Sequence, residues 1–233
     1  MKLFCIPFAG GGASAYAPWK RRLAPLASVV PIQLPGREEL WDRPYLDTVA
    51  EAALLVADKI HNKADGPYCV FGHSMGGLIA FEALRELSRR GCALPLLLIV
   101  SASPAPRLFK ARLTVSCLES EGFGRLRELL GPTYDTMAGD KDLFAYVMRT
   151  MRADVLMCER YVHESGPALP LPVEAFWASS DPLCVREEID AWDAHAGQGL
   201  RVHEFEGDHF YFKANPDFEI RLRSALEGAA ARA

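Results

Sequence analysis

The feature that most constrains the fold of this chain is an alternation of short apolar runs with longer segments of helical periodicity. Residues 96–100 read Leu-Leu-Leu-Ile-Val, and a run without polar alternation is typical of a strand covered on both faces. Strands that alternate with helices predict an α/β protein with a mostly parallel central sheet flanked by helices. With 233 residues, 50% of them hydrophobic, the chain is long enough to bury the core of one such domain.

These patterns place six strands and five helices along the chain. The strands are predicted at residues 2–7, 28–34, 67–72, 95–102, 172–178 and 200–206. The helices are predicted at residues 17–26, 48–62, 75–90, 187–196 and 216–230. Asp47 and Asn215 are the predicted N-caps of the second and last of these helices. Because we find no repeat and no low-complexity linker, we expect a single domain over residues 1–233.

The alternation stops between Ser103 and Pro170. This stretch is too long for an ordinary connection between strands, so we expect a helical lid inserted over about residues 103–170. Within it, helices are predicted at residues 119–130 and 140–164. Its methionines and aromatic residues suit either packing of the lid onto the body, which we prefer, or the lining of an apolar pocket. These residues are Met137, Met148, Met151, Met157, Phe109, Phe123, Phe144 and Tyr146.

Charge and cysteine content exclude several classes of function. The 26 basic and 30 acidic residues give a net charge of −4 and are spread along the chain, which argues against nucleic acid as a partner. The six cysteines form no C-x-x-C pair, so we expect reduced thiols and no metal site. The apolar start is interrupted by Pro7 and followed by three glycines, unlike a signal peptide. With no apolar run of about 18 residues, we expect a cytoplasmic protein without a membrane partner.

Residues 72–76 read Gly-His-Ser-Met-Gly, which fits the motif G-x-S-x-G. The motif follows an apolar strand and precedes a helix-patterned segment, the setting of the sharp nucleophile turn of α/β-hydrolases. Glycines on both sides permit the strained backbone that such a turn requires. Ser74 is therefore the candidate nucleophile, with an ordinary tight turn as the alternative. We call residues 72–77 the elbow.

A serine hydroxyl needs a base to remove its proton during attack. His73 adjoins the serine and is expected to pack or hydrogen-bond locally. In α/β-hydrolases the chain order is nucleophile, acid, histidine, which leaves His163, His195, His203 and His209. Only His209 directly follows the carboxyl end of a predicted strand, the edge where Ser74 is expected. It is the candidate general base, the alternative being a surface loop histidine.

The acid that orients the histidine should follow the preceding strand. Asp181, in Ser-Ser-Asp-Pro, follows the strand predicted at 172–178. A buried carboxylate there would select the imidazole tautomer and stabilise its cation. Asp208 is too close to His209 in sequence to fold back onto its ring. The alternative for Asp181 is that it starts a turn and caps the next helix.

A tetrahedral intermediate needs preorganised donors for its oxyanion. In this fold one backbone N–H comes from the loop after an early strand and the other from the residue after the nucleophile. We assign these donors to Ala9, in the glycine-rich loop of residues 8–12, and to Met75. The alternative, a phosphate-binding loop, lacks the G-x-x-x-x-G-K-[ST] pattern and does not complete G-x-G-x-x-G.

Together these residues resemble the type II thioesterases, stand-alone editing enzymes of nonribosomal peptide and polyketide synthases. The elbow is shared by many hydrolases, whereas Pro-Gly-Arg-Glu at 35–38 and Arg-Ala-Asp at 152–154 are more particular. The other matching segments are residues 7–11, 180–182 and 207–210. Ile6 departs mildly from the family, which often has an aromatic residue there.

The resemblance implies an α/β-hydrolase fold and an acyl thioester presented on the phosphopantetheine arm of an acyl or peptidyl carrier protein. It implies that the enzyme frees stalled carriers and needs no cofactor of its own. We expect a monomer. One alternative is a small-molecule carboxylesterase or lysophospholipase with the same triad, and another is a catalytically silent module that docks to carriers.

Overall fold

The computed structural model describes residues 1–120, 127–128 and 139–232. Within them lies a six-stranded sheet in the order β2-β1-β3-β4-β5-β6, and all neighbouring strands are parallel. The strands are β1 (Lys2–Ile6), β2 (Ser28–Pro31), β3 (Tyr68–His73), β4 (Leu97–Ser101), β5 (Val173–Ala178) and β6 (Leu200–Phe205). The predicted α/β architecture is confirmed, and each strand overlaps its predicted range.

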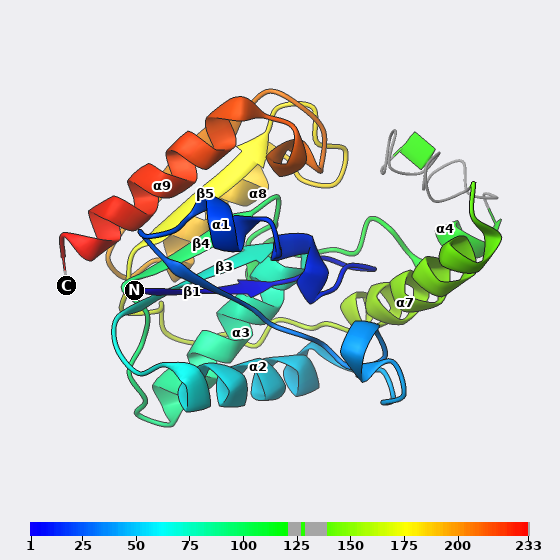
Figure 1. Ribbon diagram of the computed structural model, residues 1–233, viewed down its shortest axis with the longest axis horizontal. Coiled ribbons are helices and arrows are strands. Elements are labelled where there is room, and N and C mark those ends of the chain that lie inside the picture. The colour runs from blue at the N-terminus through cyan, green and yellow to red at the C-terminus, as the bar shows by residue number, and fades with distance from the viewer. Residues whose placement is uncertain (121–126, 129–138, 233) are drawn as a thin grey trace.

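Helices cover both faces of the sheet (Figure 1). The helices α2 (Val49–Lys63) and α3 (Met75–Arg89) pack on one face, and α1 (Trp19–Arg22) and α9 (Pro216–Ala230) pack on the other. Successive side chains of a strand enter opposite cores, so Val70 packs against α2 and α3 whereas Phe71 packs against α1 and α9. Burial on both faces explains the predominantly apolar character of the central strands β1, β3 and β4.

Two of the five helices predicted outside residues 103–170 are wrong in extent. The segment 17–26 contains only the single turn α1, preceded by a 3-10 turn at Ala13–Tyr16. The segment 187–196 divides into α8 (Arg186–Asp190) and a 3-10 helix at Ala191–His195. In the 3-10 helix the fully buried Trp192 donates its indole N–H to the carbonyl of Ser103. A tertiary contact therefore stabilises a geometry that helical periodicity alone does not predict.

One predicted helix cap is also wrong. Thr48, not Asp47, caps α2: its hydroxyl accepts the N–H of Glu51 at 3.2 Å, and the Glu51 carboxylate accepts the N–H of Thr48 at 3.3 Å. This reciprocal pair needs Ser or Thr three residues before the acid, a spacing that Asp47 does not have. Asn215 caps α9 as predicted, and its side chain accepts the N–H of Asp217 at 2.9 Å.

The long stretch between β4 and β5 contains α4 (Val115–Ser120) and α7 (Lys141–Glu159), and α7 lies beyond the carboxyl ends of the strands (Figure 1). Most of the helix predicted at 119–130 lies outside the described residues, as do Phe123 and Met137. The helix predicted at 140–164 ends early, at Glu159. Beyond it the hydroxyl of Tyr161 donates to Glu82 on α3 at 2.7 Å, which holds the chain against the body.

All six cysteines are free thiols. Four of them are buried, and burial raises the pKa of Cys69 to about 12. Among the described helices, none combines the length and the apolar character needed to span a bilayer.

Candidate active site

Ser74 lies between β3 and α3 with a backbone φ of +54°, in the left-handed region that non-glycine residues rarely adopt. The strained turn is held by two backbone hydrogen bonds. The N–H of Ser74 donates to the carbonyl of Ser101, at the end of β4, at 2.7 Å, and the N–H of Gly77 donates to the carbonyl of Ser74 at 2.9 Å. The predicted turn therefore presents Ser74 at the N-terminus of α3, where developing negative charge is favoured.

The glycines of the elbow are required by close packing. A methyl group added at Gly72 would overlap the carbonyl of Gly76, and one at Gly76 would overlap the carbonyl of Ile6 in β1. A methyl group at Gly77 would overlap the side chain of Ser103. Because two of these obstacles are backbone atoms, relief would need movement of a strand or of the turn itself.

We expect Gly76→Ala to lower the free energy of unfolding by about 1–3 kcal/mol, the usual cost of overpacking. The matched control is Gly228→Ala in α9, where the nearest atom to an added methyl group is the end of the Arg232 side chain at 3.8 Å. There alanine should stabilise by about 0.5–1 kcal/mol through helix propensity. Urea denaturation of both variants measures the difference. Equal effects of the two substitutions would show that the elbow is not tightly packed.

Asp181 and His209 form a buried pair. The Nδ1 of His209 lies 2.8 and 3.0 Å from the two carboxylate oxygens of Asp181, and both side chains are almost completely buried. Asp181 also accepts the N–H of Leu183 at 2.8 Å, so it shapes its own turn as well. It does not cap α8, whose N-cap is Val185. With Nδ1 held by the carboxylate, Nε2 of His209 is the nitrogen left for the pocket.

The pairing of β5 with β6 brings these two residues together. Beyond the strand ends, the N–H of Ser179 donates to the carbonyl of Phe205 at 3.0 Å, and the N–H of Ser180 donates to the carbonyl of Gly207 at 3.2 Å. These two bonds hold the loop after β5 against the loop after β6, beyond the ends of both strands. Gly207, with a φ of +130°, turns the second loop back. The sequence prediction that Asp181 and His209 follow adjacent strands agrees with this geometry.

The rejected histidines have other surroundings. His203 lies 2.8 Å from the carboxylate of Glu174. His163 and His195 contact each other, with ring centroids 5.3 Å apart. Burial first, and then the neighbouring His163, lowers the pKa of His195 to about 4. None of these rings lines the pocket that contains Ser74.

His73 packs against His209 and takes part in a chain of hydrogen bonds with Ser101 and Tyr211. Its Nδ1 lies 2.9 Å from the hydroxyl of Ser101, which in turn lies 2.7 Å from the hydroxyl of Tyr211. The rings of His73 and His209 are 5.0 Å apart. Burial above all, and then the nearby His209 and Lys213 side chains, lower the pKa of His73 well below its usual value. His73 therefore stays neutral and packs locally, as predicted.

The predicted oxyanion donors lie at the same end of the sheet. Ala9 follows β1 and Met75 begins α3, and both residues line the pocket beside Ser74. In the described part of the chain, neither of their backbone N–H groups donates to a carbonyl or to a side chain. Two free donors near a nucleophile could stabilise the negative charge of an acyl-transfer intermediate.

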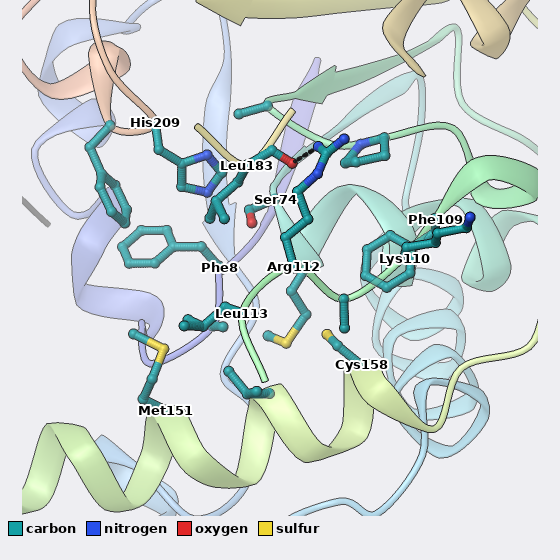
Figure 2. A pocket seen from close by; sticks show the side chains of 17 residues that line it. Phe8, Ser74, Phe109, Lys110, Arg112, Leu113, Met151, Cys158, Leu183 and His209 are labelled. Carbon is teal, nitrogen blue, oxygen red and sulfur yellow. Dashed lines mark hydrogen bonds between the residues drawn. The ribbon is translucent and has the colours of Figure 1, made fainter. Parts of the chain in front are cut away.

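These residues share a pocket with about 730 Å³ of free space, including its open mouth. Ser74 and His209 lie on one wall, and Met151 and Cys158 of α7 project from the opposite wall (Figure 2). The lining comprises Phe8, Ala9, Ser74, Met75, Ala102, Pro104, Phe109, Lys110, Ala111, Arg112, Leu113, Met151, Val155, Cys158, Leu183, His209 and Phe210. Within residues 1–120, 127–128 and 139–232, no cluster of three or more side chains suits a metal ion.

A model of the thioesterase domain family matches residues 1–223. The chain belongs to the thioesterase family. Among the relatives of this thioesterase is the gramicidin S biosynthesis protein GrsT of Aneurinibacillus migulanus, which is 31% identical over 211 residues. That match covers 91% of this chain and 82% of GrsT.

Solved structures agree with the family and with the fold. RedJ, a thioesterase from the prodiginine pathway of Streptomyces coelicolor, is 34% identical with a TM-score of 0.87, over 98% of this thioesterase and 85% of RedJ. The type II thioesterase BorB from the borrelidin biosynthetic cluster is 31% identical with a TM-score of 0.84, over 97% of this chain and 92% of BorB. The resemblance to type II thioesterases and the α/β-hydrolase fold are thereby confirmed.

Sequence reasoning missed part of the pocket wall of the thioesterase. Arg112 forms a two-pronged ion pair with Glu188 at 2.8 Å and donates to the carbonyl of Leu183 at 2.6 Å (Figure 2). This pairing neutralises the guanidinium and attaches the loop after β4 to the loop after β5. Phe109, for which core packing was preferred, both lines the pocket and packs on Tyr161. Arg112 lies in an irregular segment without helical or strand periodicity, so the sequence offered no signal for these contacts.

The methionines of the long stretch divide between the two predicted roles. Met151 lines the pocket, whereas Met157 is buried in the core beside α2 and α3 and Met148 packs at the edge of the opposite core. Cys158 adds a small apolar surface to the pocket, because burial raises the pKa of its thiol and keeps it neutral. The α7 side of the pocket is therefore apolar and uncharged, which suits an acyl chain.

Proposed function

We propose that this thioesterase hydrolyses acyl thioesters held on the phosphopantetheine arm of carrier proteins, acting as a cytoplasmic monomer without a cofactor of its own. The observation that supports this most strongly is the buried Asp181–His209 pair in the same apolar pocket as the strained Ser74. The names of the relatives, which include GrsT of gramicidin S biosynthesis and BorB of the borrelidin cluster, support the substrate class.

In the proposed mechanism, the hydroxyl oxygen of Ser74 attacks the thioester carbonyl while Nε2 of His209 accepts its proton. The N–H groups of Ala9 and Met75 stabilise the oxyanion of the tetrahedral intermediate. The intermediate collapses by expelling the phosphopantetheine sulfur as a thiolate, which takes the proton from the imidazolium of His209, so that the imidazole is neutral for the second half of the reaction. Thiols have a pKa near 8.5, so this leaving group needs less protonation than an alkoxide or an amine.

The second half of the reaction releases the acyl group as a carboxylic acid. Water loses a proton to His209 and attacks the acyl carbonyl, and the imidazolium then returns the proton to Ser74 as the ester bond breaks. Throughout, Asp181 keeps Nδ1 protonated and stabilises the cation that forms. Residues on α7 would surround the acyl chain, which is the role we propose for the long insertion as a lid.

The test compares three substrates of one acyl length: a hexanoyl-phosphopantetheinyl carrier protein, hexanoyl-CoA and p-nitrophenyl hexanoate. We expect kcat/KM to be highest for the carrier, by about tenfold or more, which corresponds to about 1.4 kcal/mol of transition-state binding by the carrier surface. Faster cleavage of the nitrophenyl ester, with the carrier thioester untouched, would favour the esterase alternative. Inert protein that still binds the carrier would favour the silent docking module.

A further inference from the structure

A buried ion pair ties α7 to the glycine-rich loop that contains Ala9. Asp154, on α7, lies 2.6 Å from each terminal nitrogen of the Arg37 guanidinium in a two-pronged contact. Both side chains are nearly inaccessible, with 3% of Arg37 and 4% of Asp154 exposed. These residues belong to the Pro-Gly-Arg-Glu and Arg-Ala-Asp segments, to which the proposed mechanism gives no role.

Both members of the pair also bind the backbone of that loop. The carboxylate of Asp154 accepts the N–H of Gly10 at 2.8 Å, and the guanidinium of Arg37 donates to the carbonyl of Gly11 at 2.9 Å. The contacts therefore hold an N–H and a carbonyl on consecutive residues, directly after Ala9. Arg37 donates as well to the carbonyl of Pro35 at 3.3 Å, which fixes its own loop.

The loop needs such external support. Gly10 has a φ of +76°, and the N–H of Gly11 donates to the carbonyl of Phe8 at 2.9 Å, so residues 8–11 form a tight turn. A run of three glycines has more backbone freedom to lose than any other sequence. The peptide plane of Ala9 lies inside this turn, so whatever holds the turn also sets the direction of the Ala9 N–H.

A buried ion pair contributes little to the free energy of unfolding compared with a well-packed apolar pair. Removing two charges from water costs several kcal/mol per ion, and well-packed apolar residues of similar volume are often as stable or more so. Here the charged groups satisfy backbone groups of the loop, which an apolar pair cannot do. The pair is therefore better suited to fixing the backbone conformation of the glycine-rich loop than to stabilising the fold.

We propose that Arg37 and Asp154 are positioning residues that hold the residue 8–12 loop so that the Ala9 N–H points at the developing oxyanion. This proposal rests on the function proposed above for Ala9. The reaction then depends on α7 through a contact that touches no substrate. A misplaced donor weakens transition-state binding without weakening binding of the ground state.

The decisive variant is the double substitution Arg37→Met with Asp154→Leu. It removes both charges together, so no unpaired ion is left buried and the fold should survive, but it leaves the Gly10 N–H without its acceptor. We expect kcat to fall by about 10- to 100-fold with KM little changed, as for a displaced oxyanion donor. Arg37→Lys is the second variant: it keeps the charge but not the two-pronged geometry, and should lose about tenfold in kcat.

A tetrahedral analogue separates positioning from general damage. Hexylboronic acid forms a tetrahedral adduct with a serine and needs the oxyanion donors, whereas hexanoate resembles the product and does not. In both variants the inhibition constant of hexylboronic acid should rise in parallel with the loss of kcat, while that of hexanoate stays near the wild-type value. Asp47→Asn is the matched control, because it removes an ion pair with Arg160, just after α7, that does not reach the loop.

Either of two results would overturn the proposal: a folded variant with wild-type kcat, or equal weakening of hexylboronic acid and hexanoate. If the double variant does not fold, Arg37→Lys decides by the same criteria. Failure of the proposed function is seen separately. Hydrolysis of the carrier thioester by the wild type tests the function, whereas the ratio of variant to wild-type rates on p-nitrophenyl hexanoate tests the positioning.

Discussion

Ser74→Ala is expected to reduce kcat by about 10⁶-fold, which is the loss seen when a triad nucleophile is removed. The remaining histidine has no hydroxyl to deprotonate, so neither the acyl-enzyme nor its hydrolysis can occur. Intact-mass spectrometry after rapid mixing with a hexanoyl thioester should show a hexanoyl adduct on the wild type and none on the variant. Steady-state release of thiol measures the rate.

The control for this result is Ser88→Ala, at the far end of the same helix, where the serine is exposed. It should leave both the adduct and the rate unchanged. A residual rate above about 1% of wild type in Ser74→Ala, equivalent to a loss of less than about 3 kcal/mol of transition-state stabilisation, would mean that another group is the nucleophile.

Asp181→Asn is expected to lower kcat by about 10⁴-fold, or about 5.4 kcal/mol of transition-state stabilisation. The amide keeps the size of the carboxylate, but its NH₂ group would face Nδ1 and favour the tautomer with the proton on Nε2. That tautomer cannot accept the proton of Ser74. The measurement is kcat and KM on the preferred thioester, and KM should change little because Asp181 lies behind the histidine.

Asp208→Asn tests whether the acid is assigned correctly. Asp208 directly precedes His209, and its carboxylate accepts the N–H of Phe210 at 2.8 Å, so it shapes the loop without binding the imidazole. The loss of kcat should be below about tenfold, in proportion to one weakened hydrogen bond. A larger loss for Asp208→Asn than for Asp181→Asn would reverse the assignment.

Ser74→Ala and Asp181→Asn act on different parts of one site. In the double variant, their losses of kcat should therefore not be additive. Once Ser74 is absent, the tautomer of His209 no longer matters to turnover, because residues that act as a unit lose their contribution together. The residual activity then reflects binding and the oxyanion donors alone.

Much of the fold and the arrangement of the candidate triad could be predicted because the signals are local. A strand buried on both faces has an uninterrupted apolar run in its sequence, as β4 does. The tight packing around residues 72 and 76 requires glycine at both positions, and these are the two glycines of the motif G-x-S-x-G. In a parallel sheet, loops that follow strand ends meet at one edge. Asp181 and His209 could therefore be placed together from their positions after β5 and β6, although their catalytic roles remain predictions.

Other features had no local signal. Helical periodicity overestimated α1 and did not show the change to 3-10 geometry at Trp192, because those outcomes depend on contacts with distant segments. The pocket-wall contacts of Arg112 were missed for the same reason, whereas for Phe109 the sequence left open both core packing and a place in the pocket wall. Irregular loops acquire their conformation from the surfaces against which they pack.

The sequence by itself determined the parallel α/β framework and the elbow, because hydrophobic periodicity and glycine placement are patterns of neighbouring residues. It also determined the order of the candidate catalytic residues, which can be read directly along the chain. Only the tertiary structure decided which polar groups meet across the molecule. Arg37 and Asp154 are separated by 117 residues, yet their charges satisfy the backbone of a third segment. Such a contact depends on the three-dimensional approach of the chain, for which a single sequence contains no repeating pattern.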